Sequence, residues 1–180
     1  MGKTLYIVRH CKATGQAPDA PLTPEGAVQA TQLADRLAEM PIQRIISSTF
    51  LRATQSIAPL AQRLNLPIIV DARLAERVLS TADLADWLSA LQATFDDLDR
   101  CLDGGESSRA AMQRAAAVAN ECALHAADVT VLVTHGNLMT LLLKHFDPRI
   151  GFAEWQRLTN PDVYRVVLAP ERAEIARVWL

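Results

Sequence analysis

Cysteine is scarce in this chain of 180 residues, which contains only Cys11, Cys101 and Cys122. No two of them form a CxxC pair, and an odd number of scattered cysteines excludes a disulfide scaffold and favours a reducing compartment. The sequence also lacks an HxH pair and an acidic cluster. Since those are the patterns that hold metal ions, neither a metal nor another cofactor is predicted.

Long apolar runs are absent as well. No segment approaches the roughly 18 apolar residues that a membrane-spanning helix needs. The run at residues 4–8 has five residues and is too short for the core of a signal peptide. We therefore expect a cytoplasmic protein without a membrane partner.

A surplus of positive charge is the third missing feature. The net charge is −2, from 18 basic and 20 acidic residues, which argues against nucleic acid as a partner. A small anionic substrate remains compatible with this balance, because a local basic pocket can exist in a nearly neutral protein. Half of the residues are apolar, and the length suits one domain, residues 1–180, with a full hydrophobic core.

Strand-like and helix-like segments alternate along most of the chain. Thr23 is expected to cap a helix whose first residue is Pro24, and Pro59 should kink the next helix or delay its start. This alternation predicts an α/β fold of three layers, α/β/α, with a mostly parallel central sheet and an antiparallel terminal hairpin. The expected strands are 4–8, 44–47, 67–70, 129–135, 164–169 and 175–180, and the expected helices are 22–40, 50–64, 82–100, about 107–126 and 136–146.

Candidate functional residues follow the ends of these strands. In such sheets, ligands bind outside the carboxyl ends of the strands, so side chains from separate segments converge at one rim. Two arginines, two histidines and one glutamate should meet there: Arg9, His10, Arg52, Glu76 and His135.

This set of side chains suits phosphate chemistry. Two guanidinium groups can grip a phosphate through paired hydrogen bonds, and the helix that begins near Gly136 offers N–H groups and a positive dipole end. One imidazole can attack phosphorus while a carboxyl group protonates the leaving oxygen. The nearby positive charges should lower the pKa of the attacking histidine and keep it neutral.

Five segments in order resemble the histidine phosphatase superfamily, the phosphoglycerate mutase-like family. "VRHCKATG" resembles the RHG motif, and "LTPEGAVQA", "SSTFLRATQS", "LAE" at residues 74–76 and "VTHGN" resemble its later segments. The match extends over roughly residues 3 to 145. One RH pair would be weak evidence, whereas five ordered segments are specific.

The resemblance implies a role for each matching residue. It implies that His10 becomes phosphohistidine, that Arg9 and Arg52 hold the phosphate with His135 as the second imidazole, and that Glu76 is the proton donor. Gly136 and Gln16 are further candidates for phosphate binding. A competing interpretation of Glu76 is a surface ion pair, because Arg73 and Arg77 flank it in the sequence.

Three positions depart from the family pattern. Cys11 replaces the usual glycine, and because glycine is favoured where the backbone lies close to the phosphate, Cys11 is expected to alter the rim of the pocket. Ala13 stands where many members have Ser or Thr, and Gln16 stands where many have Asn. "HCKATGQA" also begins like the H-C-x5-R motif of cysteine phosphatases, but the arginine position is Ala17. Without that arginine the loop cannot clamp phosphate or stabilise a thiolate, so His10 is preferred as the nucleophile.

The expected function is a phosphomonoester phosphatase that acts on a small phosphorylated metabolite. The alternatives are a phosphoglycerate mutase, a protein phosphohistidine phosphatase and, ranked lowest, a non-catalytic binding module. The resemblance associates mutases with longer chains that enclose the site, and an open site favours hydrolysis. Residues 77–105 should form an insertion that roofs the pocket, with Leu, Trp and Phe as an apolar wall and Asp side chains outside.

Overall fold

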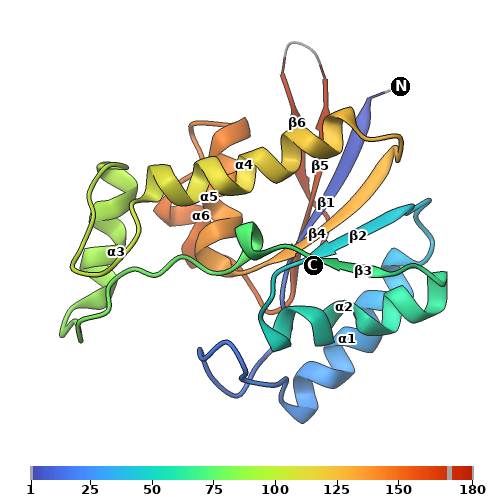
Figure 1. Ribbon diagram of the computed structural model, residues 1–180, viewed down its shortest axis with the longest axis horizontal. Helices are drawn as coiled ribbons and strands as arrows, with labels where there is room; N and C mark the ends of the chain where they lie inside the picture. Colours follow the sequence, from blue (N-terminus) through green and yellow to red (C-terminus); the bar gives the residue numbers. More distant parts are fainter. Residues whose placement is uncertain (1, 170–171, 180) are drawn as a thin grey trace.

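A twisted sheet forms the centre of the protein (Figure 1). The computed structural model describes residues 2–169 and 172–179, and within them the sheet has six strands in the order β3-β2-β4-β1-β5-β6. The strands β1, β2, β3 and β4 are parallel, whereas β5 is antiparallel to β1 and β6 is antiparallel to β5. Their bounds are β1 Lys3–Arg9, β2 Arg44–Ser47, β3 Ile68–Val70, β4 Val129–Thr134, β5 Asp162–Leu168 and β6 Glu174–Arg177.

Helices cover both faces of this sheet. In Figure 1, α1 (Pro24–Leu37) and α2 (Leu51–Leu64) lie below it, and α4 (Ser108–Leu124), α5 (Gly136–Phe146) and α6 (Phe152–Gln156) lie on the opposite side. Helix α3 (Trp87–Asp96) projects beyond them, and a 3-10 turn η1 (Ala72–Leu74) follows β3. The three-layer α/β/α fold and its mostly parallel sheet are thus confirmed.

Strand β1 shows why both faces need a cover. Leu5 and Ile7 belong to the core under α4 and α5, while Tyr6 and Val8 belong to the core under α1 and α2. All four are buried, because successive side chains of a strand point to opposite faces. A strand that is apolar at every position is therefore stable only between two helical layers.

Local signals set several helix boundaries. Thr23 caps α1 through its Oγ1, which accepts a hydrogen bond from the Gly26 N–H at 3.0 Å, and Pro24 is the first helical residue, as predicted. Pro59 lies inside α2 and does not delay its start at Leu51.

One helix prediction was too long, and one helix was missed. The helix expected over 82–100 is only Trp87–Asp96, because the Asp86 carboxylate caps its start by accepting from the Ser89 N–H, and the chain turns at Asp97. Helix α6 was not predicted, since five residues are too few to show a helical period. The terminal hairpin was predicted correctly, although Leu180 lies outside the described residues.

The parallel strands end at one edge of the sheet. Arg9 at the end of β1 pairs in register with Thr134 of β4, and Ser47 of β2 pairs with Val133. The segments that follow these strands therefore start side by side. Within residues 2–169 and 172–179, none of the helices combines the length and hydropathy required to cross a bilayer.

Candidate active site

His10 has a defined tautomer. Its Nδ1 lies 2.7 Å from the backbone oxygen of Cys11, which can only accept, so Nδ1 carries the ring proton. Nε2 then has a free lone pair, and it accepts a hydrogen bond from Nε of Arg52 at 3.2 Å. The Nδ2 of Asn160 donates to the backbone oxygen of His10 at 2.8 Å, which fixes the residue from the other side. The ring therefore presents Nε2 as its nucleophilic atom.

Arg52 comes from the first turn of α2 and is only 1% exposed. Its Nη1 donates to the backbone oxygens of Gln16 and Ala17 at 3.1 and 2.8 Å, and its guanidinium carbon lies 4.8 Å from the centroid of the Phe50 ring. These contacts hold the guanidinium group beside His10. They also tie the loop after β1 to helix α2.

Arg9 approaches from the last residue of β1. Its Nη1 donates to the backbone oxygens of Leu158 and Thr159 at 3.2 and 3.3 Å, while its buried Nε has no hydrogen-bond partner among the described residues. A Cβ at Gly136 would lie 3.2 Å from the guanidinium carbon of Arg9. Glycine at position 136 therefore lets Arg9 pack against the start of α5.

His135 is the N-cap residue of α5, and its ring centroid lies 5.1 Å from that of His10. Its Nε2 is 2.7 Å from Oγ of Ser48, whereas its buried Nδ1 has no partner within the described part of the chain. When the Ser48 hydroxyl donates to Nε2, the proton of the neutral ring lies on Nδ1. The unpartnered nitrogen is then a donor that can bind an anion.

Burial keeps both imidazoles neutral. The pKa of His10 is lowered to about 4, mainly by burial and to a smaller extent by the charges of Arg52 and Arg9, while the hydrogen bond to the Cys11 backbone oxygen acts in the opposite direction. Burial also lowers the pKa of His135 to about 2, with the nearby His10 and Arg52 as additional causes. The predicted direction for His10 is confirmed, but removal from water outweighs the neighbouring charges as its cause.

Glu76 is held by backbone N–H groups rather than by an ion pair. Its Oε1 accepts from the N–H of Arg77 at 2.9 Å and of Leu138 at 3.0 Å, and its Oε2 accepts from the N–H of Asn137 at 3.1 Å. The alternative of a surface ion pair with Arg73 is wrong, because Arg73 binds Asp71 and Glu121.

The first turn of α5 therefore binds a side chain of the protein, although it was expected to bind phosphate. Two N–H groups of its first turn, which were expected to face a phosphate, bind the Glu76 carboxylate instead. A carboxylate at a helix N-terminus is favoured by the helix dipole. This contact fixes the carboxyl group of Glu76 at the first turn of α5, the helix that His135 caps.

Cys11 does not line the site. Its side chain is fully buried in the core between the sheet and helices α1 and α2, and its N–H donates to Oγ of Ser56 at 2.8 Å. Burial raises the pKa of the thiol to about 11, so the reactive thiolate is suppressed. The expectation that Cys11 alters the pocket rim is therefore wrong.

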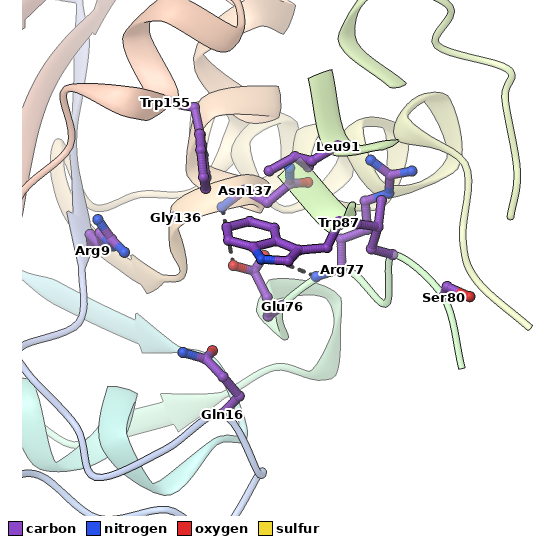
Figure 2. A pocket seen from close by; sticks show the side chains of 11 residues that line it. Arg9, Gln16, Glu76, Arg77, Ser80, Trp87, Leu91, Gly136, Asn137 and Trp155 are labelled. Atoms are coloured by element: carbon purple, nitrogen blue, oxygen red, sulfur yellow. Dashed lines mark hydrogen bonds between the residues drawn. The ribbon is translucent and has the colours of Figure 1, made fainter. Parts of the chain in front are cut away.

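A cavity of about 600 Å³ adjoins this cluster: Arg9 and Glu76 line it, whereas His10, Arg52 and His135 are not among its lining residues. Figure 2 shows Arg9 and Gln16 on one side of it, Glu76, Trp87 and Asn137 near its centre, and Trp155 above them. The side chain of Gln16 is exposed at the rim, and Gly136 forms part of the wall. The full lining is Arg9, Gln16, Glu76, Arg77, Leu79, Ser80, Trp87, Leu91, Gly136, Asn137 and Trp155.

Sequence reasoning missed several residues of this region. Ser48 contacts His135, and Trp155 from the unpredicted helix α6 closes the cavity. Asn137 lines the cavity, and neither its Oδ1 nor its Nδ2 has a partner among the described residues. "SSTF" contains Ser48, so its position beside a strand end was the available signal. No group of three or more potential metal-ligating side chains occurs in the described residues.

The site contains two neutral imidazoles, two buried guanidinium groups and a carboxyl group, which lie where the parallel strands end. This set of groups is suited to binding and transferring a phosphoryl group. The family model of the histidine phosphatase superfamily (branch 1) matches residues 5–179, so the chain belongs to this superfamily.

Individual relatives are consistent with that assignment. A probable phosphoglycerate mutase GpmB of Proteus mirabilis (strain HI4320) is 33% identical over 180 residues, which cover 90% of this chain and 83% of the relative. A structure described as mycobacterial hydrolase 1 has a TM-score of 0.82 and 23% identity, covering 99% of this chain and 98% of that one.

Another similar structure has a bound ligand. The mycobacterial glucosyl-3-phosphoglycerate phosphatase in complex with inorganic phosphate has a TM-score of 0.79 and 25% identity, covering 98% of this chain and 96% of that one. The relatives and structural neighbours are phosphatases or mutases, which supports an enzyme with phosphoryl-transfer activity.

Proposed function

We propose that the protein is a phosphomonoester phosphatase that acts through a phosphohistidine on His10, with a small phosphorylated metabolite as substrate. The observation that carries this proposal is the unprotonated Nε2 of His10 in hydrogen-bond contact with Arg52. A nucleophilic nitrogen beside a guanidinium group is an arrangement in which the same cation can bind the phosphate that the nitrogen attacks.

Arg9, Arg52 and His135 bind the phosphate oxygens in this proposal. Support comes from the buried Nε of Arg9, a donor without a partner among the described residues, and from the buried, unpartnered Nδ1 of His135, which is a donor when the Ser48 hydroxyl donates to Nε2. Burial lowers the pKa of Arg9 and of Arg52, but arginine remains charged at neutral pH. Gly136 and Gln16 complete the binding set from the cavity wall.

In the first step, the Nε2 lone pair of His10 forms a bond to phosphorus while the bond from phosphorus to the ester oxygen breaks. Glu76 donates a proton to that oxygen, and the alcohol leaves. The three N–H groups that bind Glu76 keep its carboxyl group oriented at the cavity.

In the second step, water attacks the phosphohistidine. The Glu76 carboxylate accepts the proton of the attacking water, the phosphorus–nitrogen bond breaks, and inorganic phosphate leaves. His10 regains its lone pair, and Glu76 is again protonated. The two steps together consume one water and need no metal ion.

A phosphoglycerate mutase is the second candidate, because the 33% identical relative from Proteus mirabilis is described as a probable one. In a mutase, the phosphohistidine would return its phosphoryl group to a phosphoglycerate rather than to water. We favour hydrolysis because the cavity is bordered by Trp87, which is 52% exposed, so water has access.

Two further expectations remain part of the proposal. We propose that residues 77–105 act as the pocket roof, which is supported by Arg77, Leu79, Ser80, Trp87 and Leu91 in the cavity wall. A cytoplasmic location is supported by the three free cysteines.

The test compares wild type with His10→Ala on p-nitrophenyl phosphate and on phosphoglycerate. The proposal predicts release of inorganic phosphate by wild type and none above background by His10→Ala. Isomerisation of phosphoglycerate faster than phosphate release would favour the mutase. Equal activity of wild type and variant would refute both.

A further inference from the structure

Aromatic residues gather at the end of the cavity away from His10. The chain has only nine, of which four form one contiguous cluster that runs from the cavity into the core. The Trp87 and Trp155 rings meet nearly at right angles, at 80° and 6.1 Å between centroids. Phe152 stacks on Trp155 at 5.4 Å, and Phe95 contacts Phe152.

The two tryptophans differ in how they are held. Trp155 is partly buried and supported from behind by Phe152, so it forms a fixed wall. Trp87 stands at the first position of α3 with 52% of its surface exposed, although large apolar residues are usually covered. Together with Leu91 they give the cavity an apolar corner near Glu76 (Figure 2). Leu79 also belongs to the cavity lining. A flat ring can stack on one indole and present its edge to the other.

Charge at this end of the cavity disfavours a second anionic group. Apart from Arg9 at the phosphate end, Arg77 is the one cation in the lining, and its guanidinium group donates to the Glu106 backbone oxygen and to Thr94 and Ser108. Its remaining nitrogen, Nη2, is buried and, like Nε of Arg9, has no hydrogen-bond partner among the described residues. Residues 77–105 contain six aspartates against two arginines, which adds negative potential around the roof.

The uncharged group at this wall with spare hydrogen-bonding capacity is the amide of Asn137. A leaving alcohol that binds here would therefore meet two indoles, two leucines and an amide, while the one nearby cation, Arg77, is held by its hydrogen bonds to Glu106, Thr94 and Ser108. Such surroundings suit an uncharged, largely apolar molecule, because a buried charge without a partner is costly.

We propose that the preferred substrates are monophosphate esters of uncharged alcohols that carry a flat hydrophobic ring, and that the ring binds in the corner formed by Trp87 and Trp155. This inference rests on the proposed function and specifies its substrate class. Phosphoglycerate, whose leaving group carries a carboxylate, is a poor substrate on this account.

The test uses a pair of esters with the same type of leaving oxygen. Phenethyl phosphate and ethyl phosphate both release a primary alkyl alcohol, so their difference reports ring binding and not leaving-group chemistry. Wild type should show a kcat/KM for phenethyl phosphate at least about tenfold above that for ethyl phosphate. Phosphoglycerate should be used less well than phenethyl phosphate.

Trp87→Ala should lower kcat/KM for phenethyl phosphate by about tenfold, mainly through KM, and should leave ethyl phosphate within about twofold. Leu88→Ala is the matched control, because Leu88 lies on the same turn of α3, is 41% exposed and is not part of the cavity lining. It should change neither ester. Because Trp87 is half exposed, its removal should leave the fold intact, which circular dichroism checks.

Binding offers a second readout that needs no turnover. Phenethylphosphonate, which lacks the scissile oxygen, should quench the fluorescence of wild type and bind Trp155→Ala more weakly by about tenfold.

Three results would overturn the substrate class and leave the proposed hydrolysis standing. They are equal kcat/KM of wild type for the two esters, an equal loss of kcat/KM for both esters in Trp87→Ala, and a higher kcat/KM for phosphoglycerate than for phenethyl phosphate. If no ester is hydrolysed faster than by His10→Ala, the proposed function falls, and the inference with it.

Discussion

Nε of Arg52 lies 3.2 Å from Nε2 of His10 and donates a hydrogen bond to it. Since Nδ1 of His10 donates to the Cys11 backbone oxygen, this contact occupies the one lone pair that the ring has available. A guanidinium group cannot give up a proton at neutral pH, so it orients the imidazole without protonating it. The proposed nucleophile and the proposed phosphate ligand are thereby held together before substrate binds.

Arg52→Lys should lower kcat/KM for p-nitrophenyl phosphate by about a hundredfold or more, because an ammonium group cannot bind the Gln16 and Ala17 oxygens, His10 and a phosphate at once. The matched control is Arg63→Lys on the same helix, where the side chain is exposed and pairs with Asp35. The control should keep full activity. An Arg52→Lys enzyme within threefold of wild type would argue against a role for Arg52 in phosphate binding.

Acid should destabilise the protein through His10. The folded protein holds the His10 pKa at about 4, against 6.5 for the ordinary group, so below pH 6.5 the unfolded chain binds a proton that the folded chain rejects. Stability is therefore lost as pH falls from 6.5 toward 4. Between pH 7 and 5, the free energy of unfolding of wild type should fall by about 2 kcal/mol more than that of His10→Ala.

Urea denaturation of both proteins at the two pH values measures this difference. Titrating groups that lie away from His10 contribute equally to both proteins and cancel in the comparison. An equal fall in wild type and His10→Ala would mean that His10 is not held neutral by burial.

Glu76→Gln should affect the two half-reactions in different ways. Glutamine cannot donate or accept the proton that Glu76 moves, and loss of general acid–base catalysis costs roughly a hundredfold to ten-thousandfold. With ethyl phosphate, whose leaving oxygen needs a proton, formation of the phosphoenzyme should slow by that factor. With p-nitrophenyl phosphate, whose leaving group departs as a stable anion, formation should change little while hydrolysis of the phosphoenzyme slows. Rapid-quench kinetics measure the two steps separately. If Glu76→Gln changed the rate of phosphoenzyme formation equally for both substrates, Glu76 would be excluded as the proton donor.

Cys11→Ala should change stability and not activity. The thiol packs in the core under α1 and α2, so its removal should lower the free energy of unfolding by about 1 kcal/mol. The kcat/KM should stay within about twofold of wild type. In the folded protein, iodoacetamide should label the exposed Cys101 and spare Cys11. Loss of activity on alkylation of Cys11 would reopen the cysteine mechanism.

The positions of the strands along the chain and the cap of the first helix were accessible from the sequence, because short apolar runs, Thr23 and Pro24 are local signals. The alternation of elements also indicated that Arg9, His10, Arg52 and His135 follow strand ends of one edge, although their catalytic roles stay predictions. Long-range contacts were not accessible. The binding of Glu76 by the N–H groups of α5 joins residues 61 and 62 positions apart, and no local pattern encodes it.

Cys11 shows the limit of motif comparison. Position 11 was expected to face the phosphate because the family places glycine there. The backbone instead turns its side chain into the core, where a small apolar group fits. Helix α6 and its Trp155 were missed because a helix of five residues has no period to recognise.

The central claim is that His10 carries the phosphoryl group. Glu76→Gln should be mixed with p-nitrophenyl phosphate, quenched in alkali, in which phosphohistidine survives, and digested for mass spectrometry. The account predicts one phosphoryl group on the peptide that contains His10, and none when His10 is also replaced by alanine. A phosphoryl group on Cys11 or on any other residue, or hydrolysis by wild type that persists after His10→Ala, would contradict it.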